Sequence, residues 1–147
     1  MIQSLFINEL NNIKIFTDGG SRGNPGLAAI GVYIDINGSK KSFGQVIGTT
    51  TNNVAEYEAM IFGLKKIKQL IGKTVSKQAT ISAFADSELL IKQLNGVYKI
   101  EDENLQKLWM QIWNLKMEFK EVKFAHVRRE FNKDADKMVN LALDGKL

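Results

Sequence analysis

The stretch that decides the fold is IFTDGGSRGNPG, which runs from Ile15 to Gly26. It begins as an apolar strand and places Asp18 at the end of that strand. The turn that follows contains four glycines and one proline, so its backbone can approach a ligand without a side-chain barrier. A carboxylate at a strand end, beside such a turn, indicates a binding site at this edge of the predicted sheet.

Three further carboxylates occupy comparable places along the chain. Glu56 falls in the first turn of a helix predicted in TTTNNVAEYEAMIFGL, whose threonines and asparagines suit a helix cap. Asp86 ends the short apolar strand of AFADSELLIKQL, and Asp136 opens the last helix in HVRREFNKDADKMVNLAL. Ligands bind at the carboxyl ends of parallel strands, so Asp18 and Asp86 are expected to meet at one edge. The pattern predicts a divalent-metal site.

Hydrophobic periodicity predicts an α/β fold. Alternation indicates five strands, which are a first strand beginning at Ile13, then 28–36, 41–48, 80–85 and 121–127. Asn37-Gly38 predicts a tight turn between the second and third strands, so the first three strands form an antiparallel meander. Helices are expected over 53–71, 87–94, 105–115 and 133–143. The fourth strand must run parallel to the first, because a helical crossover joins them.

The third of these helices carries two tryptophans. Trp109 and Trp113 are spaced i and i+4 on an apolar stripe with Leu108 and Ile112. We expect both to pack in the core, and stacking on nucleic-acid bases is the alternative.

Composition narrows the class of protein. A chain of 147 residues with 44% hydrophobic residues predicts one domain, 1–147, with a single core. No apolar run reaches the about 18 to 20 residues of a membrane span, and no leader pattern is visible, so a cytoplasmic location is expected. With no cysteine and one histidine, a metal would be held by oxygen atoms, which favours Mg²⁺ or Mn²⁺.

The charge balance suits a polyanionic partner without requiring one. The formal net charge is +4, from 20 basic and 16 acidic residues. Arg128 and Arg129 lie in the predicted loop before Asp136, and we expect them to contact phosphate.

Four segments together resemble type 1 ribonuclease H. They are DGGSRGNPG, TNNVAEYEA, DSELLIKQLNGVYKI and NKDADKMVN; they occur in the family's order, and the resemblance covers residues 13–144. It implies a ribonuclease H-like fold, a mixed five-stranded sheet in the order 3-2-1-4-5 with strand 2 antiparallel and helices on both faces. Residues 1–12 fall outside the resemblance, and we expect them to form an N-terminal extension, either an extra strand or a loose arm.

The resemblance also implies the catalytic groups. The family's four metal-binding carboxylates fall on Asp18, Glu56, Asp86 and Asp136. Asp134 competes for the last place, but the family's pattern of Ala-Asp before a Leu/Met-x-Asn stretch selects Asp136. A histidine that assists proton transfer or product release falls on His126, ten residues before Asp136, although a histidine at a strand end is often structural.

The implied reaction is hydrolysis within the RNA strand of an RNA–DNA hybrid with two Mg²⁺ ions, or Mn²⁺ as the alternative, leaving 3′-hydroxyl and 5′-phosphate ends. A monomer is expected by default, because no feature of the sequence indicates an oligomer. The expected substrate contacts are Gly20, Ser21, Arg22, Gly23, Asn24, Thr51, Asn52, Asn53, Arg128 and Arg129. Two alternatives stay open. One is a module that binds hybrids or double-stranded RNA without cleavage, and the other is a related nuclease that acts on DNA.

The chain departs from well-known bacterial members in two places. Glu88 stands where they carry a glutamine that touches substrate, and an acid facing phosphates would weaken binding. Their long basic protrusion is replaced by the short loop 99–104, so the chain resembles the compact form of the family.

Overall fold

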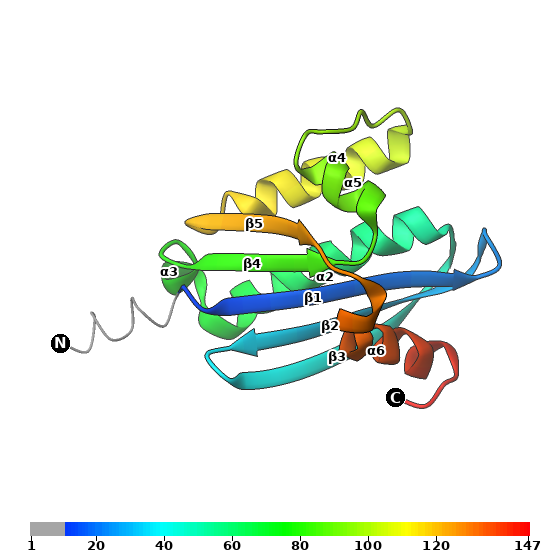
Figure 1. The fold of residues 1–147 in the computed structure, drawn as a ribbon, viewed down its shortest axis with the longest axis horizontal. Coiled ribbons are helices and arrows are strands. Elements are labelled where there is room, and N and C mark those ends of the chain that lie inside the picture. The colour runs from blue at the N-terminus through cyan, green and yellow to red at the C-terminus, as the bar shows by residue number, and fades with distance from the viewer. Residues whose placement is uncertain (1–10) are drawn as a thin grey trace.

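The computed structural model describes residues 11–147, so most of the expected N-terminal extension lies outside the described residues. In chain order the elements are β1 (Ile13–Arg22), β2 (Gly26–Ile36), β3 (Ser39–Thr50), α2 (Asn52–Ile71), α3 (Lys73–Ser76), β4 (Thr80–Ala85), α4 (Glu88–Leu94), α5 (Glu103–Lys116), β5 (Glu121–His126), the 3-10 turn η1 (Arg129–Phe131) and α6 (Lys133–Leu143). Figure 1 shows them as one sheet with helices on both faces.

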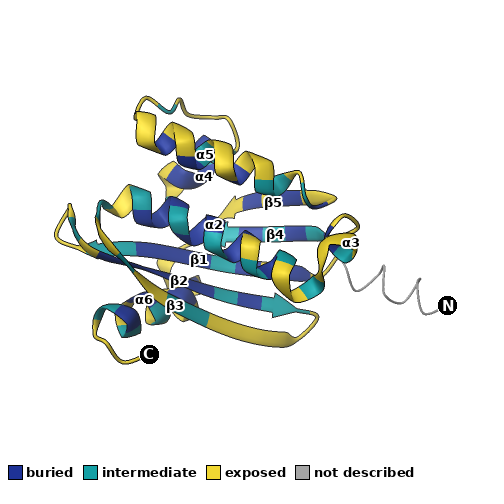
Figure 2. Ribbon diagram, turned by 180° about the vertical axis from the view of Figure 1, so that it is seen from behind, coloured by how far each residue is buried: buried dark blue, intermediate teal, exposed yellow. Residues whose placement is uncertain are grey.

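The sheet has the order β3-β2-β1-β4-β5, which confirms the expected topology. β2 is antiparallel to β1 and β3, whereas β4 is parallel to β1 and β5. Helices α2, α4 and α5 cover one face, as the view from behind shows (Figure 2), and α6 crosses the other face. The parallel pairing places the carboxyl end of β4 beside Thr17 of β1, and ligand sites form where a parallel ladder ends in this way.

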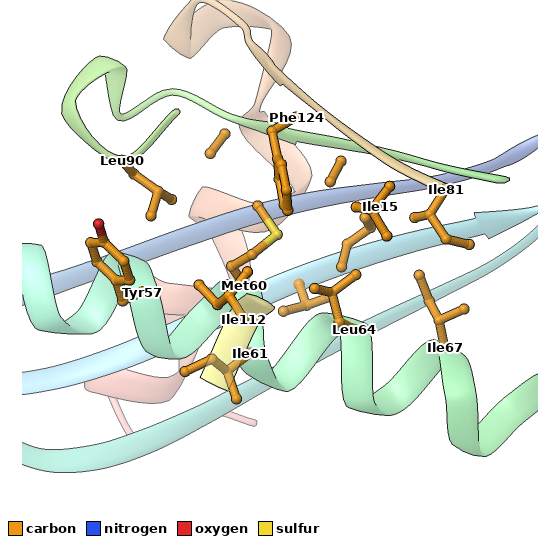
Figure 3. Close-up of a cluster of buried hydrophobic side chains, with 14 of the residues drawn as sticks. Ile15, Tyr57, Met60, Ile61, Leu64, Ile67, Ile81, Leu90, Ile112 and Phe124 are labelled. Carbon is orange, nitrogen blue, oxygen red and sulfur yellow. The ribbon is translucent and has the colours of Figure 1, made fainter. Parts of the chain in front are cut away.

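The main core fills the space between the sheet and helices α2, α4 and α5 (Figure 3). Ile15 and Ile81 of the sheet face Met60, Leu64 and other residues of α2, all fully buried. Close packing depends on Gly63, because a Cβ at this position would lie 2.0 Å from Cδ1 of Ile15. The helix therefore lies directly on β1, and its first turns are fixed relative to the strand.

The predicted role of the tryptophans is wrong for Trp113. The buried residues of α5 are Leu105, Leu108 and Ile112, whereas Trp113 is 44% exposed. One helical step of about 100° past Ile112 carries Trp113 off the core-facing stripe. There its ring stacks on Trp109, with 5.7 Å between the ring centroids.

Several boundaries also differ from expectation. Helix α3 and the turn η1 were not predicted. Strand β2 begins two residues earlier than the alternation indicated, and β3 extends further at both ends. Within residues 11–147, no helix has the length and apolar character needed to cross a membrane.

Candidate active site

The four predicted carboxylates line one cavity of about 470 Å³ at the edge where the parallel pairing of β1 with β4 ends. Carboxylate oxygens of Asp18, Glu56 and Asp86 lie within 4.8 Å of one another. Asp136 is close enough to Asp18 for its charge to raise the pKa of that carboxyl. The structure thus brings together residues that are spread over most of the sequence.

Asp18 reaches the cavity from inside a strand, not from its end. The parallel pairing of β1 with β4 stops at Thr17 and Ala85, but β1 continues to Arg22 through its antiparallel pairing with β2. The prediction that the strand ends at Asp18 is therefore wrong. Asp18 nonetheless lies where the parallel ladder ends, and Asp86 directly follows β4, as expected.

Glu56 lies beyond the first turn of α2, which contradicts the predicted position. Thr51 caps the helix by accepting a hydrogen bond from the Val54 amide at 3.3 Å, so the helix begins at Asn52. Glu56 is buried against the sheet because α2 touches β1 at Gly19, where a Cβ would lie 2.2 Å from the Ala55 carbonyl carbon. A glycine at this position allows Glu56 to stand beside Asp18.

Asp136 lies in the first turn of α6, as predicted. This helix packs closely on β2, since a Cβ at Gly31 would lie 2.0 Å from the carbonyl oxygen of Ala135. Asp134 shares the first turn but lines a separate, smaller cavity of about 120 Å³ with Phe16 and other residues. The geometry therefore favours Asp136 over Asp134 as the fourth carboxylate.

The cluster carries unfavourable electrostatics in the absence of a cation. Burial, followed by the charges of Asp86 and Asp136, raises the pKa of Asp18 to about 7. Burial, followed by the charges of Asp18 and Asp86, raises the pKa of Glu56 well above its usual range. None of the ion pairs within residues 11–147 involves these four carboxylates.

The cluster fits a divalent cation on two grounds. Oε2 of Glu56 is buried and has no hydrogen-bond partner among the described residues, and such an atom is costly to leave unpaired. The ligand atoms available are carboxylate oxygens, the donors that Mg²⁺ and Mn²⁺ prefer. A cation here would satisfy the unpaired oxygen and remove the repulsion.

Comparison with known proteins agrees with the fold and the cluster. Residues 16–142 match a family model described as reverse transcriptase-like. The solved structure of the LC11 ribonuclease H1 in complex with an RNA/DNA hybrid is 42% identical with a TM-score of 0.85, and the match covers 91% of this chain and 98% of that one. The chain belongs to the type 1 ribonuclease H family.

Other relatives in this family are of similar distance. The solved ribonuclease H1 of the halophilic archaeon Halobacterium salinarum is 34% identical, with a TM-score of 0.83 over 90% of this chain and 98% of that one. Among curated proteins, a bifunctional protein of Mycobacterium tuberculosis is 36% identical over 135 residues, and ribonuclease HI of Halobacterium salinarum is 33% identical over 135 residues. These alignments cover 90% of this chain but 35% and 64% of the two relatives, so the chain spans less than two thirds of their length.

The substrate contacts expected from the ribonuclease H resemblance divide into two groups. Gly20, Ser21, Arg22, Asn52 and Arg129 line the cavity, whereas Gly23, Asn24, Thr51, Asn53 and Arg128 do not. The backbone amide and the hydroxyl group of Ser21 donate to Oδ1 of Asn52, at 2.9 and 3.1 Å. The backbone amide of Asn52 in turn donates to Oδ1 of Asn24 at 3.0 Å. These bonds fix the β1–β2 hairpin against the start of α2 and so shape one wall of the cavity.

The charged residues around the cavity are not equivalent. The Arg128 side chain is 79% exposed and lies 4.0 Å from Glu130, whereas Arg129 faces the cavity. Arg22 forms an ion pair with Asp144 at the end of α6. Both observations make Arg129 the cavity's best candidate for a phosphate contact.

His126 and Glu88 lie beside Asp86. His126 is exposed at the end of β5, and its Nε2 lies 3.2 Å from the backbone oxygen of Asp86. Glu88 forms an ion pair with Lys92 at 2.7 Å, and this lysine holds the pKa of Glu88 below its usual range. The acid at position 88 is therefore partly neutralised by its own helix.

Sequence reasoning missed Asn132. It is 1% exposed, and its Nδ2 donates to the Thr17 carbonyl at 2.9 Å and to Oδ2 of Asp86 at 3.3 Å. Asn132 stands directly before a predicted helix, where an asparagine is typical of an ordinary cap, and no local signal separates that role from the one observed.

Proposed function

We propose that this chain cleaves the RNA strand of RNA–DNA hybrids at internal positions, leaving 3′-hydroxyl and 5′-phosphate ends. The observation that carries the proposal is the cluster of four carboxylates around the unpaired, buried oxygen of Glu56. Support comes from the family, since one relative at 42% identity was solved in complex with an RNA/DNA hybrid.

The carboxylates of Asp18, Glu56, Asp86 and Asp136 would hold the metal. Two divalent ions held there would supply an activated water and would stabilise the oxygen that leaves the phosphorus. Asp18 is the shared ligand in this proposal, because it is close to all three other carboxylates. Asp136 is exposed, and we propose that it is the most mobile ligand of the four. We propose Mg²⁺ as the ion, with Mn²⁺ as a substitute.

The remaining residues of the cavity bind and orient the substrate. The guanidinium group of Arg129 is suited to hold a phosphate, and the glycines of β1 let the hybrid approach the carboxylates. Asn52 and Glu56 carry groups that can bond the ribose 2′-hydroxyl, which distinguishes RNA from DNA. His126, next to Asp86, is a candidate for moving a proton at the leaving oxygen.

The test is cleavage of a matched panel of labelled substrates with Mg²⁺ and with Mn²⁺. Only the RNA–DNA hybrid should be cut efficiently, and one deoxyribose at the cut position should block cleavage there. A gel shift of the hybrid without cleavage would support the binding-module alternative. Equal cutting of the deoxyribose substrate would support a nuclease that acts on DNA.

A pair of variants tests the metal site. Asp18→Asn should reduce kcat by about 10³-fold or more, because it removes the charge at the centre of the cluster with little change in volume. Asp134→Asn is the matched control, since this carboxylate starts the same helix as Asp136 but lines another cavity. Asp134→Asn should keep wild-type kcat. Near-normal activity of Asp18→Asn would remove Asp18 from its proposed role.

The monomeric state and the cytoplasmic location expected from the sequence stay predictions. Light scattering of the purified chain and fractionation of cells that express it would test them.

A further inference from the structure

Asn132 connects three of the elements that carry the carboxylates. Its Nδ2 donates to the carbonyl of Thr17, the residue before Asp18, and also to Oδ2 of Asp86. Its own carbonyl accepts the first helical hydrogen bond of α6, from the amide of Asp136, at 3.2 Å. One buried residue thus sets the relative positions of β1, the end of β4 and the start of α6.

Helix capping does not explain why the Asn132 side chain is buried at this position. Thr51, Ser87 and Asp102 precede helices α2, α4 and α5, and each accepts a hydrogen bond from a backbone amide of its helix. Asn132 occupies the same position before α6 but makes no such bond. Its Oδ1 is buried without a partner among the described residues, which weakens the fold. The favourable contribution of the side chain therefore comes from the two hydrogen bonds that its Nδ2 donates.

The bond to Asp86 has a consequence for metal binding. A carboxylate surrounded by other carboxylates rotates away from them when nothing holds it, because like charges repel. The donor from Asn132 fixes one oxygen of Asp86 and leaves the other for a cation. Groups that hydrogen-bond to metal ligands in this way fix ligand orientation and raise affinity.

We infer that Asn132 is a positioning residue that orients Asp86 and sets the spacing of Asp18, Asp86 and Asp136 for metal binding. The inference rests on the proposed function for its catalytic consequence, but its effect on metal affinity is independent of the nucleic-acid substrate.

The experiment compares Asn132→Ala with Asn95→Ala. Asn95 is the matched control because its Nδ2 donates to the Phe124 carbonyl at 3.0 Å, joining α4 to β5 without a carboxylate partner. Mg²⁺ binding is measured by isothermal titration calorimetry without nucleic acid, alongside Tm and the kcat and KM for a hybrid. Asn132→Ala should weaken Mg²⁺ binding by about 10-fold or more and lower kcat similarly, with KM changed by less than about twofold. Asn95→Ala should lower Tm but keep Mg²⁺ affinity and kcat.

A folded Asn132→Ala protein with wild-type Mg²⁺ affinity and kcat overturns the inference. Should this variant not fold, Asn132→Asp decides, because it keeps the shape of the side chain but cannot donate to Asp86. A loss of kcat with unchanged KM in Asn132→Asp supports the inference, and wild-type kcat overturns it. If the wild-type chain binds Mg²⁺ but leaves hybrids uncut, the proposed function fails while the calorimetric comparison still tests Asn132.

Discussion

Adding one methyl group at Gly31, as in Gly31→Ala, should remove most of the activity while the protein stays folded. Gly31 pairs with Asp18 across β1 and β2, at the point where α6 crosses the sheet. A Cβ there would lie 2.0 Å from the Ala135 carbonyl oxygen and 2.9 Å from the Val139 amide nitrogen. Cβ atoms essentially never come within 3.0 Å of such atoms. The distance between the new Cβ and the Ala135 oxygen must therefore grow from 2.0 Å to at least 3.0 Å, which requires α6 to move by about 1 Å.

The magnitude follows from what this part of α6 carries. Ala135 precedes Asp136, so the shift moves a carboxylate of the cavity by about the same distance. A misplacement of about 1 Å in a catalytic site lowers the rate by about 10²-fold. The same overpacking destabilises the fold by about 1–3 kcal/mol, and each kcal/mol lowers Tm by about 2–4 °C for a chain of this size. Gly31→Ala should therefore stay folded at 25 °C while losing most of its kcat.

Gly63→Ala provides the control. A Cβ at Gly63 also has a nearest distance of 2.0 Å, but the atom it meets is Cδ1 of Ile15, the end of a flexible side chain in the core. This variant should lose stability and keep its kcat. The measurements are thermal denaturation and kcat on a labelled hybrid at saturating Mg²⁺. Wild-type kcat in Gly31→Ala, or an equal loss of kcat in Gly63→Ala, would refute the argument that the close approach of α6 sets the position of Asp136.

Two other predictions concern charge. The pKa of Asp18 is raised from 3.8 to about 7, and that of Glu56 is also raised. Between about pH 4 and pH 7 the metal-free folded protein therefore binds more protons than the unfolded chain. Its free energy of unfolding should therefore fall as pH rises from about 4 to 7, and it should fall less steeply in Asp18→Asn. Urea denaturation in the presence of EDTA measures this free energy at each pH. A free energy of unfolding that rises across this pH range would contradict the prediction. Arg129→Ala should weaken hybrid binding and lower the slope of log K against log salt concentration by about 1, the value for one lost phosphate contact. Arg128→Ala should have a much smaller effect on both, because Arg128 lies outside the cavity. Binding at two salt concentrations tests the difference, and equal effects of the two variants would count against the phosphate contact of Arg129.

The type and order of the site residues could be predicted from the sequence, but their local positions could not. Several threonines and asparagines precede the first helix, and only the structure identifies Thr51 as the cap. With the helix start ambiguous by a residue or more, the sequence placed Glu56 in the first turn, whereas it lies just beyond that turn. Similarly, DGGSR continues β1 only because β2 pairs with it, and that partner is not visible in the local pattern around Asp18.

Long-range contacts explain the remaining differences. Asn132 bonds to Asp86 and Thr17 across 46 and 115 positions of the chain, and no short motif encodes such contacts. The sheet order was likewise implied by the family resemblance, because periodicity gives strands but not their neighbours. The exposure of Trp113 depends on which face of α5 packs against α2 and the core, and that follows from the tertiary structure.

The expectation that Glu88 weakens substrate binding also depends on a contact that spacing alone left open. Lys92 is four residues further along α4, and its amine lies 2.7 Å from the Glu88 carboxylate. The same amine lies 3.1 Å from the hydroxyl of Tyr98, just before the loop 99–104. Both partners are exposed, so the pair is weak and screened by salt. The repulsion of a phosphate by Glu88 is therefore reduced without being abolished, and in the proposed function the attraction for the hybrid comes from Arg129 and from the carboxylates once they hold metal.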